Sequence, residues 1–124
     1  MRKEINKIIA KAEDFYEDAD YLFKGGRYEA VVNRSYYAMF TMIQAILLME
    51  NVFSKTHQGT MIKFHELFIK TGKLPVNLGK MLNETFEKRQ FGDYDVDANI
   101  SEEEAKEVLE NARIFLNEIK TYLK

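Results

Sequence analysis

The 124-residue sequence predicts an all-α fold. It contains one proline and six glycines, so few residues interrupt regular structure, and it is rich in Glu, Lys, Ala, Leu and Met, which favour helices. Apolar side chains recur at steps of three and four with charged residues between them, which is the pattern of amphipathic helices. With 46% hydrophobic and 31% charged residues, we expect one domain, residues 1 to 124, with a substantial core.

Two long helices are expected in the first half of the chain. The first covers residues 3 to 24, and Gly25 and Gly26 end it. The second runs from about residue 27 to residue 50. Because it is apolar on almost every side from Tyr36 onward, we expect it to be the most enclosed element, with other helices around it.

A third helix is expected over residues 58 to 71, with Ser54 or Thr56 available to cap its first turn. Gly72 is placed to stop this helix. Pro75 is placed to begin the next helix at its first turn, where a missing amide hydrogen costs nothing.

The fourth helix is expected to run to about Phe91, where Gly92 offers a C-terminal stop. Ser101 and Glu104 have the spacing of a capping box and begin a fifth amphipathic helix that reaches Leu123. Short connections between long helices favour antiparallel neighbours. We therefore expect an up-and-down antiparallel bundle of four to five helices.

The composition excludes several kinds of site. Without cysteine there is no disulfide, zinc–thiolate site, iron–sulfur cluster or thiol catalysis, and two histidines cannot build a three-histidine metal site, so no cofactor is expected. A net charge of −2 gives no general attraction to nucleic acid or membrane. No secretory signal or apolar segment of roughly 20 residues is visible, so we expect a cytoplasmic protein with no membrane partner.

Charge is distributed less evenly than the total implies. Residues 55 to 91 contain seven Lys or Arg and three Glu, whereas residues 92 to 124 contain four basic and nine acidic side chains. Two interpretations stay open. The charges either form solvated helix faces, or the basic middle meets phosphate or the acidic surface of a partner.

Arg34 lies inside the otherwise apolar second helix, where an unpaired charge is costly. Thr41 lies two turns further on the same face, with Tyr37 between them. Arg34 therefore either forms a structural ion pair with a neighbouring helix or lines a cleft. Tyr36 and Tyr37 are expected to be core aromatics rather than reactive phenols.

Arg89, Asp93 and Tyr94 form a second candidate group at the expected end of the fourth helix. Arg89 and Asp93 are one turn apart and can pair, while Gly92 lets the chain bend so that Tyr94 points back beside them. A guanidinium group donates bidentate hydrogen bonds to phosphate, and a tyrosine offers a ring face and a hydroxyl. The alternative is an ion pair of Arg89 with Asp93 or Asp95 that only fixes the loop.

The acidic loop before the fifth helix carries a weaker metal-binding alternative. Asp93, Asp95, Asp97 and Glu104 have the spacing of ligands in a calcium-binding EF-hand loop. Ala98, however, stands where such a loop needs glycine, and no second loop exists to pair with it.

His57 and His65 lie on one helix face only if the third helix already covers residue 57, and we expect that it does not. A single histidine near a helix start is more often a cap or surface residue than a catalyst. No order of Ser, His and Asp indicates a nucleophilic triad.

Four segments occur in a distinctive order and spacing. They are YEAVVNRSYYAMF on the second helix, SKTHQGTMIKFHELFIKTGKL on the third, RQFGDYD before the last helix and ISEEEAKEVLENARIFLNEIKTYL at the end. Together they cover nearly the whole chain and resemble the prokaryotic HEPN domain, specifically its small stand-alone members. The resemblance implies a bundle of four to five helices, a homodimer, and a minimal nucleotidyltransferase as the partner in a toxin–antitoxin pair.

Many HEPN proteins are metal-independent ribonucleases that use an arginine and a histidine four to six residues further on, with two copies meeting across a dimer. By position Arg89 resembles that arginine, but no histidine follows it at this spacing. Thr41 likewise stands seven residues after Arg34, where related sequences often carry histidine. In related pairs the transferase modifies a tyrosine near the motif, which implies Tyr94 as an acceptor.

The leading interpretation is a HEPN binding subunit in which Arg34, Tyr37 and Arg89 bind the phosphate of RNA or of a nucleotide. Arg89, Asp93 and Tyr94 are the candidates for catalysis. One alternative is a ribonuclease toxin in which Asp93 or Tyr94 assists Arg89 in place of histidine; another is a purely structural helical dimer. The binding hypothesis requires Arg34 and Arg89 to converge in one pocket.

Overall fold

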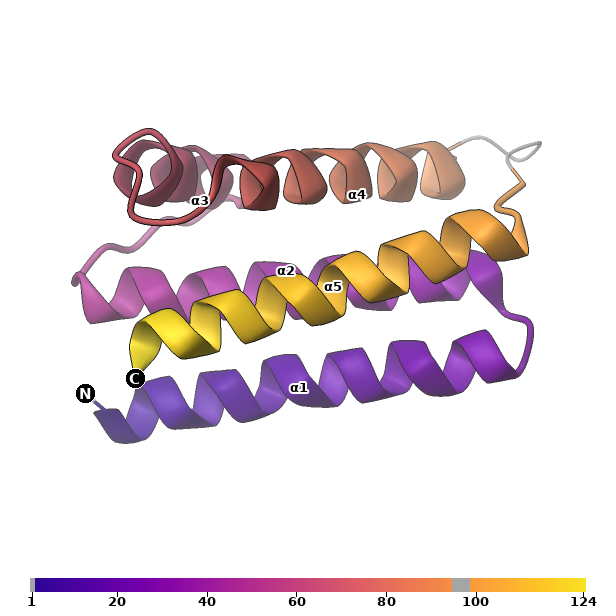
Figure 1. Ribbon diagram of the computed structural model, residues 1–124, viewed down its shortest axis with the longest axis horizontal. Coiled ribbons are helices and arrows are strands. Elements are labelled where there is room, and N and C mark those ends of the chain that lie inside the picture. The colour runs from indigo at the N-terminus through magenta and orange to yellow at the C-terminus, as the bar shows by residue number, and fades with distance from the viewer. Residues whose placement is uncertain (1, 95–98) are drawn as a thin grey trace.

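The structure is a computed structural model that describes residues 2–94 and 99–124, with the backbone alone for residues 91–94. In this part of the chain all regular structure is helical: α1 Arg2–Lys24, α2 Tyr28–Met49, α3 His57–Phe64, the π-helical turn η1 His65–Ile69, α4 Val76–Tyr94 and α5 Glu102–Leu123. Figure 1 shows that α1, α2, α4 and α5 run alternately in opposite directions, with both chain termini at the same end. The predicted all-α antiparallel bundle is confirmed.

The central helix α2 is the most enclosed element, as its apolar sequence predicts. It contacts α1, α3, α4 and α5, and Tyr36, Met39 and Ile43 on it are fully buried. Phe64 from α3 and Phe115 from α5 pack into the same core. Burying a large apolar side chain contributes roughly 1.5 to 3 kcal/mol, so α2 organises much of the apolar stabilisation. Within the described ranges, no helix combines the length and apolar character needed to cross a bilayer.

The C-terminal end of α1 and the N-terminal end of α5 are capped where the sequence predicts. Gly26 has a φ of 75°, which glycine adopts without strain, and its amide hydrogen-bonds back into α1 at 3.0 Å. Ser101 Oγ accepts from the Glu104 amide at 3.1 Å, and the Glu104 carboxylate accepts from the Ser101 amide at 3.3 Å, which is the predicted capping box. The starts of α2 and α5 meet, and Tyr28 donates to Glu102 at 2.8 Å.

The segment after α2 differs from the helix predicted over residues 58 to 71. Thr56 is the capping residue and accepts from the Gly59 amide at 2.9 Å. The helix therefore begins at His57 and covers a residue that we expected to lie outside it. From His65 the chain continues as the π-helical turn η1, a local irregularity that is common at functional sites.

Helix α4 is longer than predicted. It begins directly after Pro75, whose carbonyl accepts from the Leu78 amide at 3.1 Å, and it continues through Gly92 to Tyr94. The expected stop at Gly92 is therefore wrong. A glycine within a helix costs only about 1 kcal/mol relative to alanine, so it permits a helix end without requiring one.

Candidate functional site

Arg34 on α2 is half-buried and lies against aromatic rings. Its Cζ is 5.7 Å from the ring centre of Phe15 on α1 and 5.7 Å from that of Tyr37, both of which are cation–π distances. The structural ion pair considered for Arg34 does not form with any of the residues that the structure describes. A half-buried cation without an acidic partner there is available to an anion.

Arg89 on α4 packs against two consecutive tyrosines of α2. Its Cζ is 5.0 Å from the ring centre of Tyr36 and 5.2 Å from that of Tyr37. Arg89 Nη2 also donates a hydrogen bond to Tyr37 Oη at 3.2 Å. Because Arg34 contacts the same Tyr37 ring, two arginines that are far apart in the sequence converge on one tyrosine.

Both arginines line one cavity of about 210 Å³, which we call the arginine cavity. It is lined by Glu29, Ala30, Val32, Asn33, Arg34, Lys88, Arg89 and Ile100. Three of these described side chains are cationic and one is a carboxylate, so positive charge predominates among them. Lys88 was not among the predicted site residues, although it belongs to the basic stretch of residues 55 to 91.

A histidine from α3 contacts the two tyrosines, although none follows Arg89 closely in the sequence. His57 Nδ1 lies 3.0 Å from Tyr36 Oη. The imidazole also packs against Phe40, with ring centres 4.0 Å apart, and lies 6.1 Å from the ring centre of Tyr37. Thr56 caps the start of α3, so His57 does not have the capping role that the sequence suggested. Below, the arginine–tyrosine cluster means Arg34, Tyr36, Tyr37, His57 and Arg89.

The pKa values of Tyr36 and His57 both shift in the direction that favours the neutral side chain. Burial raises the pKa of Tyr36 to about 12, although the Arg89 charge opposes this. Desolvation lowers the pKa of His57, and the positive charge of Arg89 lowers it further. With a hydrogen on Nδ1, His57 donates to Tyr36 Oη, Tyr36 donates to Met61 Sδ at 3.9 Å, and His57 Nε2 keeps a lone pair that can accept a proton.

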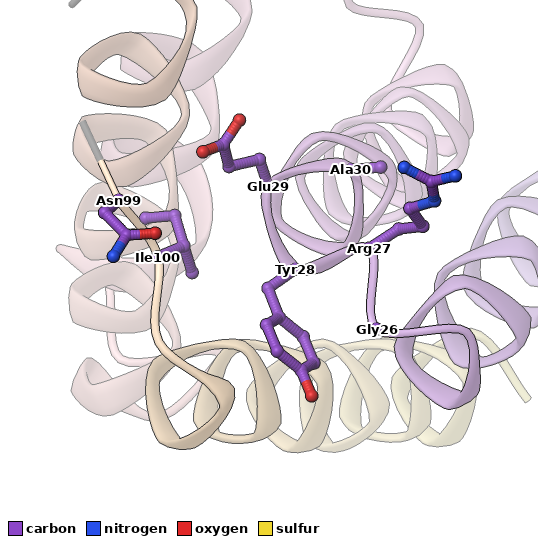
Figure 2. Close-up of a pocket in the computed structure, with 7 residues that line it drawn as sticks. All are labelled: Gly26, Arg27, Tyr28, Glu29, Ala30, Asn99 and Ile100. Atoms are coloured by element: carbon purple, nitrogen blue, oxygen red, sulfur yellow. The ribbon is translucent and has the colours of Figure 1, made fainter. Parts of the chain in front are cut away.

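A second hollow, of about 390 Å³, lies where the start of α2 meets the segment before α5. It shares three lining residues with the arginine cavity, namely Glu29, Ala30 and Ile100. Figure 2 shows Glu29 extending toward the side of Asn99, while Arg27 points the other way. With a carboxylate on this side and the guanidinium turned away, the hollow suits an anion less well than the arginine cavity does.

The remaining predicted site residues fall at the edge of the described structure. The backbone of Asp93 and Tyr94 lies in the last turn of α4, but the structure does not describe their side chains. Asp95 and Asp97 lie outside the described residues. Glu104 is engaged in the capping box, and no cluster of three metal-ligating side chains occurs in the described part of the chain. The catalytic roles of Asp93 and Tyr94 and the calcium alternative stay predictions.

The fold and the cluster together define a class: small antiparallel helical bundles with a cationic and aromatic site on their central helix. A family model described as HEPN domain matches residues 5–122. The chain therefore belongs to the HEPN domain family, and the resemblance found in the sequence is confirmed.

Three relatives align over most of their length. A protein of Methanocaldococcus jannaschii named "Putative toxin MJ0142" is 39% identical over 122 residues, which cover 98% of this chain and 83% of that protein. "Putative toxin MJ0605" of the same organism is 33% identical over 124 residues, or 100% of this chain and 92% of that protein. A UPF0332 protein of Thermotoga maritima is 38% identical over 109 residues, covering 88% of this chain and 83% of that protein.

We predict that protonation of His57 destabilises the fold. Because its pKa is lower in the folded than in the unfolded chain, where it is about 6.5, the unfolded chain binds more protons. The stability linked to this shift is fully present above the unfolded pKa and is lost as pH falls from there through the folded pKa. The His57→Gln variant should therefore show a free energy of unfolding that depends less on pH, measured in urea between about pH 5 and 7. The same pH dependence in both proteins would contradict this assignment.

Proposed function

We propose that this HEPN protein binds the phosphate groups of RNA, or of a nucleotide, in the arginine cavity. The half-buried Arg34 supports this most strongly, because it lines the cavity and has no acidic partner among the residues described. Arg89 lines the same cavity while two tyrosine rings hold it. Lys88 adds a third cation.

Phosphate suits this arrangement better than a carboxylate or a neutral group does. Guanidinium groups donate bidentate, charge-assisted hydrogen bonds to phosphate oxygens. Charges that are partly removed from water also attract an anion more strongly than fully exposed charges do. Tyr37 contacts both Arg34 and Arg89, so we assign it the role of orienting the two cations.

We further propose that the protein acts as a homodimer with a minimal nucleotidyltransferase as its partner, in a toxin–antitoxin pair. The names of the two Methanocaldococcus jannaschii relatives support a toxin-type role. The resemblance to HEPN proteins that are paired with such transferases supports the partner. Tyr94, in the last turn of α4, is the hydroxyl that we assign as the acceptor of a nucleotidyl group.

Removing one guanidinium group should weaken RNA binding. We expect Arg34→Gln and Arg89→Gln each to lower the affinity for a single-stranded RNA by about tenfold at low salt. Each should also reduce the slope of log affinity against log salt by about one, because one phosphate contact is lost. The matched control is Arg113→Gln, because Arg113 pairs with Glu110 on the exposed face of α5. Fluorescence anisotropy at several salt concentrations measures both quantities, and unchanged affinity and slope in the two site variants would refute the proposal.

Tyr94 should accept one nucleotidyl unit when the protein is incubated with its cognate transferase and ATP. The phenol oxygen attacks the α-phosphorus, the bond to the β-phosphate breaks, and pyrophosphate leaves. Intact mass should rise by one nucleotidyl unit in the wild type and not in Tyr94→Phe. Tyr21→Phe is the control and should still gain the mass, since Tyr21 is an exposed phenol on α1. An unmodified wild type, or a modified Tyr94→Phe, counts against this step.

A metal-independent ribonuclease is the second candidate function, and the position of His57 favours it. Cleavage by the ribose 2′-hydroxyl needs a group that accepts its proton and a cation that stabilises the negative charge on the phosphorane oxygens. The 5′ oxygen takes up a proton as its bond to phosphorus breaks. His57 can accept the proton at Nε2, and Arg89 supplies the cation. An imidazole from α3 then takes the place of the histidine that is missing after Arg89.

If this second function holds, the wild type cleaves RNA in the presence of EDTA. His57→Ala and Arg89→Ala should each slow cleavage by about 100-fold or more, because each removes one of the two chemical roles. Lys55→Ala, an exposed change in the loop before α3, is the control and should leave the rate unchanged. An inactive wild type would remove the ribonuclease function and leave the binding proposal intact.

A further inference from the structure

A pocket next to Tyr36 has a chemical character unlike that of the arginine cavity. It has a volume of about 450 Å³ and lies between α4 and the segment formed by α3 and η1. We call it the amide pocket, and it is lined by Gln58, Met61, Ile62, His65, Asn83, Phe86 and Gln90. Among the residues that the structure describes, this lining contains no Lys, Arg, Asp or Glu. Its polar groups are three amides and an imidazole, and Phe86 adds an aromatic face.

The amide pocket adjoins the arginine–tyrosine cluster through Tyr36. The ring of Tyr36 packs against Phe86, with centres 5.6 Å apart, and its hydroxyl lies 3.9 Å from Met61 Sδ. The same ring contacts the Arg89 guanidinium group and His57. The buried Tyr36 therefore lies behind two lining residues of the amide pocket and links them to the cluster.

On each of two helices, one residue belongs to the arginine–tyrosine cluster and the next residue lines the amide pocket. On α3, His57 belongs to the arginine–tyrosine cluster, and the next residue, Gln58, lines the amide pocket. On α4, Arg89 and Gln90 divide in the same way. Because neighbouring residues on a helix point in directions about 100° apart, the same two helix turns present charge to one site and amides to the other.

We propose that the amide pocket binds a nucleobase of the RNA or nucleotide whose phosphate occupies the arginine cavity. This rests on the proposed function. Amide side chains both donate and accept hydrogen bonds and so match the edges of bases. Phe86 and the apolar side chains of Met61 and Ile62 suit the face of a flat ring. The absence of Lys and Arg from the described lining disfavours a second phosphate there and favours an uncharged heteroaromatic group.

The packing of η1 against α4 gives the pocket its shape and orients one of its amides. A β-carbon at Gly79 would lie 2.8 Å from His65 Cε1, so any larger residue there would displace the imidazole from its present position. His65 Nε2 lies 3.2 Å from Asn83 Oδ1. When the imidazole donates to that oxygen, the amide NH₂ group of Asn83 remains to donate to a base.

Comparing base-containing with abasic chains separates the contribution of the amide pocket from that of the arginine cavity. We would measure the affinity of the wild type for A, C, G and U homopolymers, for an abasic chain of the same length, and for the four nucleoside monophosphates. We expect at least one base to bind about tenfold more tightly than its abasic counterpart. Asn83→Leu and Gln90→Leu should remove most of this difference without changing affinity for the abasic chain. Asn77→Leu, exposed on the same helix α4, is the control and should keep the difference.

These measurements distinguish an RNA chain from a free nucleotide as the ligand. They also test the nucleobase site separately from phosphate binding. A base preference in the monophosphates indicates a free nucleotide, and a preference confined to the homopolymers indicates an RNA chain; both support the pocket. Equal affinity of the wild type for base-containing and abasic chains overturns the nucleobase site and leaves phosphate binding standing. Absence of binding to every chain and monophosphate overturns both proposals. If Asn83→Leu and Gln90→Leu change the oligomeric state in sedimentation and leave base preference unchanged, the pocket is a protein interface and the nucleobase site is wrong.

Discussion

Arg89 packs against the rings of both Tyr36 and Tyr37, and this contact joins α4 to the central helix of the bundle. Its Cζ lies 5.0 and 5.2 Å from the two ring centres, and its Nη2 donates to Tyr37 Oη at 3.2 Å. A cation that is partly removed from water needs such compensation, so α4 cannot slide along α2 without losing it. Phe86 and Gln90, one turn before Arg89 and one residue after it, take their positions from the same contact.

The helix that carries the two tyrosines is also the centre of the apolar core. Tyr36 is fully buried, while its hydroxyl reaches His57, so the site inherits the rigidity of the core. Among the described lining residues, Arg34, Lys88 and Arg89 place three cationic groups and Glu29 one carboxylate around the arginine cavity. Like charges gathered in this way depart from the arrangement that stability alone favours, and such departures are expected at functional sites rather than in the rest of a core.

The sequence was sufficient for features that depend on neighbouring residues. The capping box at Ser101 follows from local spacing, and Arg34 was notable because a charge is costly in an apolar helix. His57 could not be assigned in this way, because it is 21 residues from Tyr36 and no periodicity links the two. Local sequence could not predict that α4 continues through Gly92, because one glycine lowers the stability of a helix only slightly. Tertiary packing decides such cases.

If an anion binds in the arginine cavity as proposed, Arg89 couples its binding to the binding of a proton by His57. The positive charge of Arg89 contributes to the lowered pKa of His57. An anion on Arg89 offsets that charge and raises the proton affinity of His57, and by reciprocity a protonated His57 strengthens anion binding. In the proposed ribonuclease function, the imidazole would then be a better proton acceptor when phosphate is bound, which is the direction that attack by a 2′-hydroxyl requires. Because such coupling depends on distance in space and not on sequence separation, a histidine on α3 can take part in it.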